Sequence, residues 1–156
     1  MTILEVVVAA AIIVTVVTGL SGAWQLYLKI SNINSQNTQA ALLAEEAEEA
    51  LNIMRDQSWS ANILPLTTTP NQIYYLYWSG NAYAATTTAT AADSSGSFMR
   101  TIVFKPISRD STTKDISASG TNDPNTKQVT ITVYPTGNAS TTLIKADMLI
   151  HNVYNN

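Results

Sequence analysis

The sequence predicts an α+β protein in which a long N-terminal helix carries an antiparallel β-sheet on its C-terminal half. Two observations lead to this prediction. Residues 6–28 form an uncharged apolar run, and the pattern that follows stays helical, with no proline before Pro65. From residue 73 onward, short stretches rich in β-branched and aromatic residues alternate with turn-forming residues, which is typical of strands. A chain of 156 residues has room for the helix and one small head domain.

The first predicted element is one continuous helix from about residue 2 to about residue 57, roughly 80 Å long at 1.5 Å per residue. Residues 1–28 are apolar on all sides, as in a membrane or filament core, and residues 29–57 continue as an amphipathic helix. The expected core-facing stripe consists of Ala40, Leu43, Ala47, Leu51 and Met54. The opposite face carries Glu45, Glu46, Glu48 and Glu49. We interpret this acidic face as solvated surface, with contact to basic residues of a neighbouring subunit as the alternative.

The head domain, residues 58–156, is predicted to be an antiparallel sheet. Strict alternation places Val129, Ile131 and Val133 on the core face of one strand. Turn chemistry in Pro-Thr-Gly-Asn after it predicts that the last two strands form a hairpin. Aromatic residues of the first strand are interpreted as filling both of its faces rather than as an adhesive surface. Strands are expected at residues 73–78, at 99–105 ending before Pro106, at 128–134 and at 142–153.

Two segments, residues 82–97 and 108–126, are predicted to be loops because small and polar residues dominate them. The second contains Asp110, Asp115 and Asp123, whose oxygens are ligands that Ca²⁺ prefers. Their spacing matches no EF-hand, so turn formation is the simpler interpretation. The only N-glycosylation sequon begins at Asn138, in the predicted hairpin turn.

Composition argues against several classes of function. The chain has no cysteine, so neither a disulfide framework nor a thiolate metal site is available. Its few lysines and arginines are scattered and form no basic block, which argues against nucleic-acid binding. The sequence has no glycine-rich phosphate loop and no HExxH motif, and its single histidine, His151, lies on a terminal strand. We therefore predict no enzymatic activity and no cofactor.

Glu5 is the residue that a plain membrane helix does not explain. The 23 uncharged residues between Glu5 and Lys29 can cross a hydrocarbon core of roughly 30 Å. A cleavable secretory signal does not fit, because no Lys or Arg precedes Lys29 and the apolar run is too long. A plain membrane anchor fits the length but leaves a costly carboxylate beside the membrane. In a third interpretation Glu5 meets a free amino group at Met1, its own or a neighbour's, and sets helices in axial register.

This N-terminal pattern, Met1-Thr2-Ile3-Leu4-Glu5 followed by an apolar helix, resembles the processed N-terminus of type IV pilins and pseudopilins. The resemblance implies that a prepilin peptidase cuts before Met1 and that the new amine is N-methylated. It also implies that Glu5, with Thr2 beside it, guides docking into a growing filament. Where many members have a helix-kinking proline this chain has Gly22, with Gly19 one turn earlier. We expect these two glycines to mark a helix-melting region.

We therefore expect a structural subunit that polymerises through its N-terminal helix into an extracellular type IV pilus filament. The filament is expected to be a homo-oligomer of identical subunits, with this chain as the major pilin. Its further partners would be the prepilin peptidase, the pilus assembly machinery and, before assembly, the cytoplasmic membrane. A minor pilin and a type II secretion pseudopilin are alternatives within the class. A membrane-anchored surface binding or adhesion domain that does not polymerise is the alternative from another class.

Overall fold

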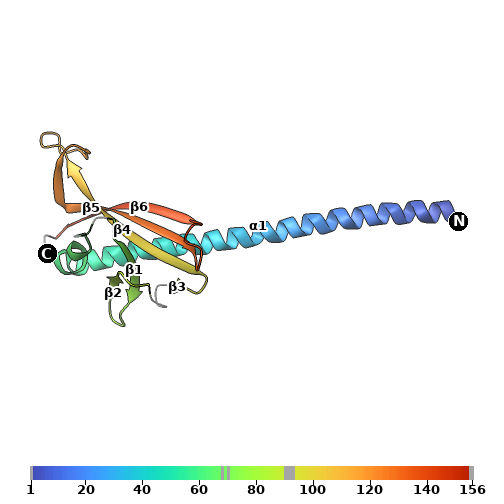
Figure 1. Ribbon diagram of the computed structural model, residues 1–156, viewed down its shortest axis with the longest axis horizontal. Coiled ribbons are helices and arrows are strands. Elements are labelled where there is room, and N and C mark those ends of the chain that lie inside the picture. The colour runs from blue at the N-terminus through green and yellow to red at the C-terminus, as the bar shows by residue number, and fades with distance from the viewer. Residues whose placement is uncertain (1, 68, 70, 90–93, 155–156) are drawn as a thin grey trace. The chain divides into compact units, whose positions relative to one another are not determined.

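The computed structural model describes residues 2–67, 69, 71–89 and 94–154. It confirms the predicted α+β fold, with a long N-terminal helix and an antiparallel sheet (Figure 1). The elements in chain order are α1(Ile3–Gln57), η1(Trp59–Ile63), η2(Leu64–Thr67), β1(Ile73–Trp78), β2(Tyr83–Thr86), β3(Ser94–Ser95), β4(Phe98–Arg109), β5(Thr121–Pro135) and β6(Ile144–His151).

Packing divides the chain into two compact units, Met1–Thr38 and Gln39–Asn156. The first unit is the N-terminal part of α1, and the second contains the rest of α1 and the sheet. These units are defined by which residues pack together. The predicted boundaries at residues 28 and 57 are defined by hydrophobic pattern, so the two divisions describe different properties.

The sheet of the second unit has the strand order β2-β1-β4-β5-β6, and β3 pairs with β4. All of these pairings are antiparallel, and β5 and β6 form the predicted hairpin. The predicted inward residues Val129, Ile131 and Val133 are all fully buried. Tyr74 is buried while Tyr75 is only half-buried, so the aromatic residues of β1 fill both of its faces, as predicted. The sheet also contributes Leu76, Phe98, Ile102, Phe104 and Ile150 to the core.

Alanines form most of the helix surface that packs against this core. Ala40, Ala44, Ala47 and Ala50 are at most 4% exposed, and they recur at three- and four-residue spacing. Leu51 and Met54 complete the stripe. Small side chains let the helix backbone lie close to the sheet, whose larger side chains then fill the space. Leu43, predicted to belong to this stripe, is only partly buried, because the stripe is centred on Ala44 and Ala47 instead.

Arg100 is a buried cation that links β4 to the helix. Its side chain is 9% exposed, and its Nη1 atom donates a hydrogen bond to the backbone oxygen of Leu43 at 3.0 Å. The same atom lies 3.5 Å from a carboxylate oxygen of Glu46. Within the described chain the Nε atom of Arg100 is buried and has no hydrogen-bond partner. This link therefore adds orientation between helix and sheet at a desolvation cost.

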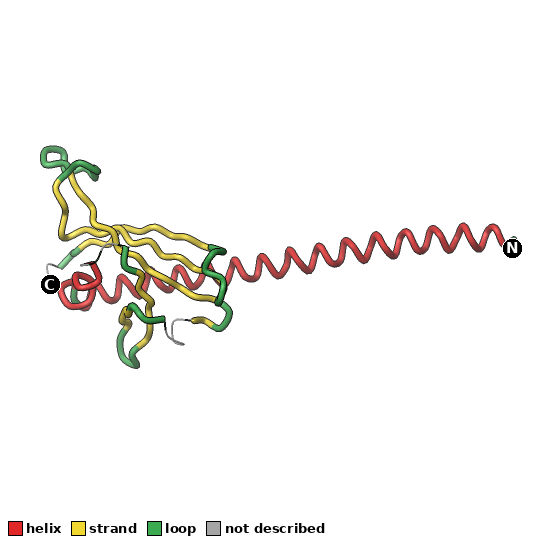
Figure 2. The backbone as a smooth tube through the Cα atoms, in the orientation of Figure 1, coloured by secondary structure: helices red, strands yellow, loops and turns green. Residues whose placement is uncertain are grey.

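The strand predictions were wrong around Pro106. β4 does not end before this residue but continues to Arg109, and β5 begins at Thr121 rather than at residue 128. A register shift between Pro106 and Ile107 accommodates the proline, which cannot donate a backbone hydrogen bond. Residues 107–123, called the arm below, therefore form a hairpin that projects from the sheet (Figure 2). Most of the predicted loop 108–126 belongs to this arm.

The other predicted loop contains two short strands. β2 (Tyr83–Thr86) pairs with β1, and β3 (Ser94–Ser95) pairs with β4. Its residues 90–93 lie outside the described part of the chain. The two central residues of β2 are alanines, which carry little strand signal, so the sequence pattern did not reveal this strand.

We predict that Ala47→Leu destabilises the second unit. The added side chain has no space between helix and sheet, and overpacking of this kind costs about 1–3 kcal/mol. Thermal unfolding of the detergent-solubilised chain, followed by near-ultraviolet circular dichroism, measures the effect. Glu49→Leu is the matched control on the exposed face of the same helix and should change stability by less than about 0.5 kcal/mol. Equal melting temperatures for Ala47→Leu and the wild type would contradict the close packing.

Candidate functional site

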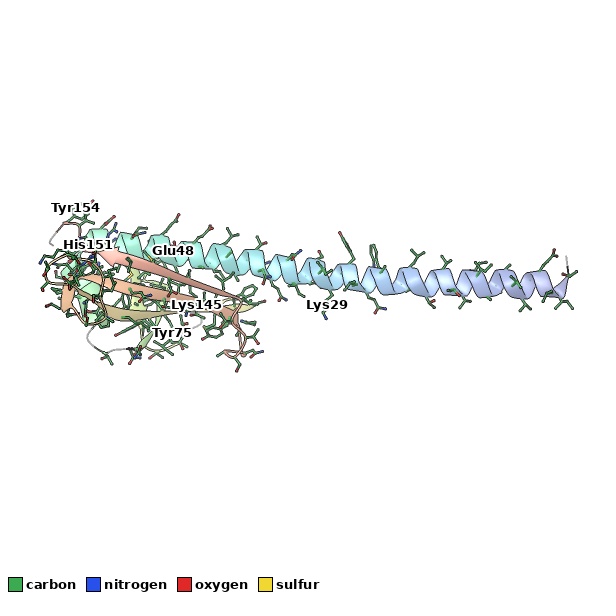
Figure 3. All side chains as sticks on the ribbon, turned by 90° about the horizontal axis from the view of Figure 1, so that it is seen from above. Lys29, Glu48, Tyr75, Lys145, His151 and Tyr154 are labelled. Carbon is green, nitrogen blue, oxygen red and sulfur yellow. The ribbon has the colours of Figure 1, made fainter. Side chains whose placement is uncertain are left out.

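The candidate site is the surface of α1 within the first unit, where apolar side chains are exposed. Fifteen large apolar side chains between Ile3 and Leu28 are 45–85% exposed. In Figure 3 the side chains of this unit point outward around the helix, with Lys29 among them. The helix is long and apolar enough to cross a membrane. An apolar surface of this extent marks an interface with lipid or with another protein.

The hydroxyl groups within this apolar surface are satisfied by the helix itself. Thr15 donates to the backbone oxygen of Ala11, and Ser21 donates to that of Val17, each at 2.9 Å. Thr18 lies 2.9 Å from the backbone oxygens of both Val14 and Thr15. These hydroxyls therefore need no water, so the surface can be buried without an unsatisfied donor.

Glu5 caps the start of its own helix. Its Oε2 atom accepts a hydrogen bond from the backbone N–H of Thr2 at 2.9 Å. With α1 beginning at Ile3, Thr2 is the N-cap and Glu5 is the third helical residue, which is half of a capping box. The Thr-x-x-Glu spacing in the sequence signals this cap, a role of Glu5 beyond its charge.

Glu5 also borders a shallow apolar groove on the helix surface. Leu4, Val8, Ala9 and Ile12 line this groove together with Glu5, and its volume is about 310 Å³. Glu5 is exposed. Met1, the residue expected to carry the methylated amine, lies outside the described residues. The structure thus places Thr2 and Glu5 together, and the pairing of Glu5 with an amine stays a prediction.

Gly19 and Gly22 lie inside the continuous helix α1. Apart from the adjacent residues and the backbone of the same helix, no atom lies within 4 Å of the position that a Cβ would occupy at either glycine, so both face open space. α1 is unbroken at both glycines, and the helix-melting region predicted at these residues stays a prediction.

The three aspartates of the suggested Ca²⁺ loop have separate roles in the arm. Asp110 accepts hydrogen bonds from the backbone N–H groups of Thr112 and Thr113, at 2.7 and 2.9 Å, which is the predicted turn chemistry. These backbone hydrogen bonds lower the pKa of Asp110. Asp115 is exposed, and Asp123 pairs with Arg109. No group of three Asp, Glu or His side chains in the described chain is arranged to hold a metal ion.

Arg109 organises the base of the arm. Its Nε atom lies 2.7 Å from Oδ2 of Asp123, and its Nη1 atom donates to the backbone oxygen of Lys114 at 3.1 Å. The Nη2 atom of Arg109 lies 3.4 Å from Oγ1 of Thr126. The same Oγ1 atom lies 2.8 Å from Nδ1 of His151. This network joins β4, β5 and β6 where the arm leaves the sheet.

Burial alone would raise the pKa of Asp123, but its polar neighbours lower it to about 2. They act through hydrogen bonds from Arg109, Thr126 and the backbone of Asn125, and through the charge of Arg109. Burial lowers the pKa of the neighbouring Lys127, and the charge of Asp123 opposes this shift.

Asn138, the glycosylation candidate, lies in the turn between β5 and β6. Its side chain is exposed, and its backbone N–H donates to the oxygen of Pro135 at 3.0 Å. A glycan would have room there, and modification stays a prediction.

On the acidic face of α1, Glu45, Glu46 and Glu49 are exposed and Glu48 is half-buried.

We predict that the Arg109–Asp123 pair stabilises the second unit at neutral pH and not in strong acid. The lowered pKa means that the pair contributes fully above pH 3.8, the ordinary value, and that the contribution is lost as pH falls through about 2. Because Asp123 keeps some contact with solvent, we expect Asp123→Asn to cost about 1–2 kcal/mol at pH 7.

Thermal unfolding of the detergent-solubilised chain between pH 7 and pH 2 measures this difference. The melting temperatures of Asp123→Asn and the wild type should converge toward pH 2. Asp115→Asn, which changes an exposed carboxylate of the same arm, should melt like the wild type throughout. A difference for Asp123→Asn that did not depend on pH would contradict the ion pair as its cause.

The chain was compared with protein-family models, with curated proteins and with solved structures, and none of these comparisons found a match.

Proposed function

We propose that this chain is a structural subunit that polymerises through α1 into an extracellular filament of the type IV pilus class. The observation that carries the proposal is the exposed apolar surface of the first unit, with a single carboxylate at its beginning. Before assembly this helix would lie in the cytoplasmic membrane, with the sheet domain outside. During assembly it would leave the lipid and pack against the same helix of other copies.

The size of the apolar surface supports a helix that passes from lipid to other subunits without exposure to water. Fully burying one Val, Leu or Ile side chain stabilises by about 1.5–3 kcal/mol. With fifteen large apolar side chains at least 45% exposed, covering them is worth on the order of 10 kcal/mol or more. This exceeds the net stability of many small domains, so such a surface needs lipid or protein against it.

Glu5 supports the filament over a simple anchor. In a membrane helix the carboxylate could remain at the interface, but a helix bundle would bury it and so require a cation beside it. One of its oxygens already accepts a hydrogen bond from the N–H of Thr2, which leaves the second oxygen for another donor. The methylated amine of a neighbouring subunit is the partner that the resemblance to pilins implies.

The rival function is a membrane-anchored surface domain that does not polymerise. The same apolar helix favours it, because length and composition suit a membrane span. A minor pilin or a pseudopilin would share the assembly chemistry and differ in abundance. Electron microscopy of material sheared from the cell surface, with mass spectrometry of its protein, separates these possibilities.

We predict that Glu5→Gln reduces filament yield at least about tenfold, because a neutral amide cannot neutralise the neighbour's cation in a buried site. The amide oxygen of Gln still accepts the N–H of Thr2, so the helix cap survives. Glu5→Ala removes both cap and charge and should reduce yield at least as much. Both variants should remain in the membrane fraction at wild-type levels.

Counting filaments per cell and blotting the membrane fraction together test this prediction. Glu49→Gln, the same change on the exposed face of the second unit, is the matched control and should leave the yield unchanged. Normal filaments from Glu5→Gln would mean that Glu5 serves as a cap alone. An absence of filaments from the wild type, with intact protein in the membrane, would favour the anchored domain.

A further inference from the structure

Residues 31–38 of α1, called the amide segment below, have an unusual surface for an exposed helix. Their sequence is Ser-Asn-Ile-Asn-Ser-Gln-Asn-Thr, so seven of eight side chains are amides or hydroxyls. All eight residues are helical and exposed, and all belong to the first unit. No charged residue occurs between Lys29 and Glu45.

This composition gives the helix weak local support. Ser, Asn and Thr are poorer helix formers than Ala, because their side chains compete for backbone hydrogen bonds. Exposed helices usually compensate with opposite charges three or four residues apart, and the amide segment has no charges. A helix that is polar on all sides either bridges two domains through solvent, carries many such pairs, or is not stable alone. Without such pairs, the amide segment depends for its helicity on the flanking turns of α1, and a packing partner would add to this support.

The chemistry of the segment indicates which partner this is. A side-chain amide carries both a donor and an acceptor, so it can hydrogen-bond to a copy of itself. A charged side chain cannot, because identical charges repel. An interface between identical helices therefore favours amides and hydroxyls over Lys and Glu. The glutamates from Glu45 onward, by contrast, have the charge expected of a surface that faces water.

We propose that the amide segment packs against α1 helices of neighbouring copies of this chain, through hydrogen bonds between side-chain amides and hydroxyls. This inference rests on the proposed function, because it extends the helix-to-helix contact beyond the apolar residues 3–28. Hydrogen bonds between amides are directional, so this contact selects among the axial registers that apolar packing leaves open. The second copy is thus recognised by polar chemistry as well as by apolar burial.

Labelling of a single thiol tests whether the segment is covered in the filament. The chain has no cysteine, so Asn34→Cys introduces its only thiol. We expect maleimide to modify this thiol at least about tenfold more slowly in sheared filaments than in the detergent-solubilised chain, because packing excludes the reagent. Ser31→Cys, a nearly isosteric change, provides a second site. Ser111→Cys, exposed on the arm, is the control and should react at similar rates in both states.

Substitutions test whether the amides themselves make the contact. Replacing Asn32, Asn34 and Asn37 together by Asp keeps the shape and adds like charges, and filament yield should fall at least about tenfold. Replacing the same three residues by Ala improves helix propensity but removes the hydrogen bonds, and yield should also fall. The same Asn→Asp change at Asn122 on the arm, where the side chain is exposed, should leave yield unchanged.

The outcomes separate this inference from the proposed function. Wild-type filaments in which the thiols at positions 31 and 34 react as fast as in detergent would overturn the inference and leave the proposed function standing. Normal yield from the triple Asp variant would also overturn it. Higher yield from the triple Ala variant would show that only helix propensity matters at this segment, which again contradicts the amide contact. A wild-type chain that forms no filaments would overturn both proposals.

Discussion

The constraint on which the rest of this molecule depends is an apolar helix surface that its own chain does not cover. The described side chains of α1 from Ile3 to Leu28 are exposed. Glu5 is the only charged side chain in this part of the sequence. Because an apolar area of this size is unfavourable in water, it marks a surface that lies against lipid or against protein. The internal hydrogen bonds of Thr15, Thr18 and Ser21 suit either environment, since they leave no hydroxyl donor without an acceptor.

In the second unit, by contrast, one face of α1 is buried within the same chain, against the sheet. The alanine stripe of Ala40, Ala44, Ala47 and Ala50 lets α1 lie close to the sheet, and aromatic and β-branched residues of the strands fill the core. Arg100 fixes the helix against β4 through the backbone of Leu43 and the carboxylate of Glu46. One helix therefore carries two kinds of surface, and the amide segment lies between the apolar residues and the stripe. In the proposed assembly, the apolar residues and the amide segment pack against other copies, whereas the alanine stripe packs against the chain's own sheet.

Regular patterns in the sequence predicted the parts of the fold that depend on periodicity. The inward face of β5 followed from alternate spacing, which burial of one face imposes. The bounds of α1 followed from the apolar run, the amphipathic spacing after it and the absence of proline before Pro65. The arm was missed because Pro106 normally ends a strand, and only the register shift beside it allows β4 to continue. The buried positions of Arg100 and Lys127 depend on three-dimensional packing and left no local signal. The Thr2–Glu5 cap did leave a local signal, which is the Thr-x-x-Glu spacing.

The cap changes what Glu5 contributes to the proposed assembly. A carboxylate on a freely rotating side chain loses conformational entropy when it pairs, and this loss weakens the pair. The hydrogen bond from the N–H of Thr2 holds the Glu5 carboxylate before any partner arrives. Part of the entropy cost is then met within the subunit, as in other preorganised binding sites. Capping and docking are therefore compatible roles for one side chain, because the cap uses the oxygen Oε2 and leaves Oε1 for a neighbour's cation.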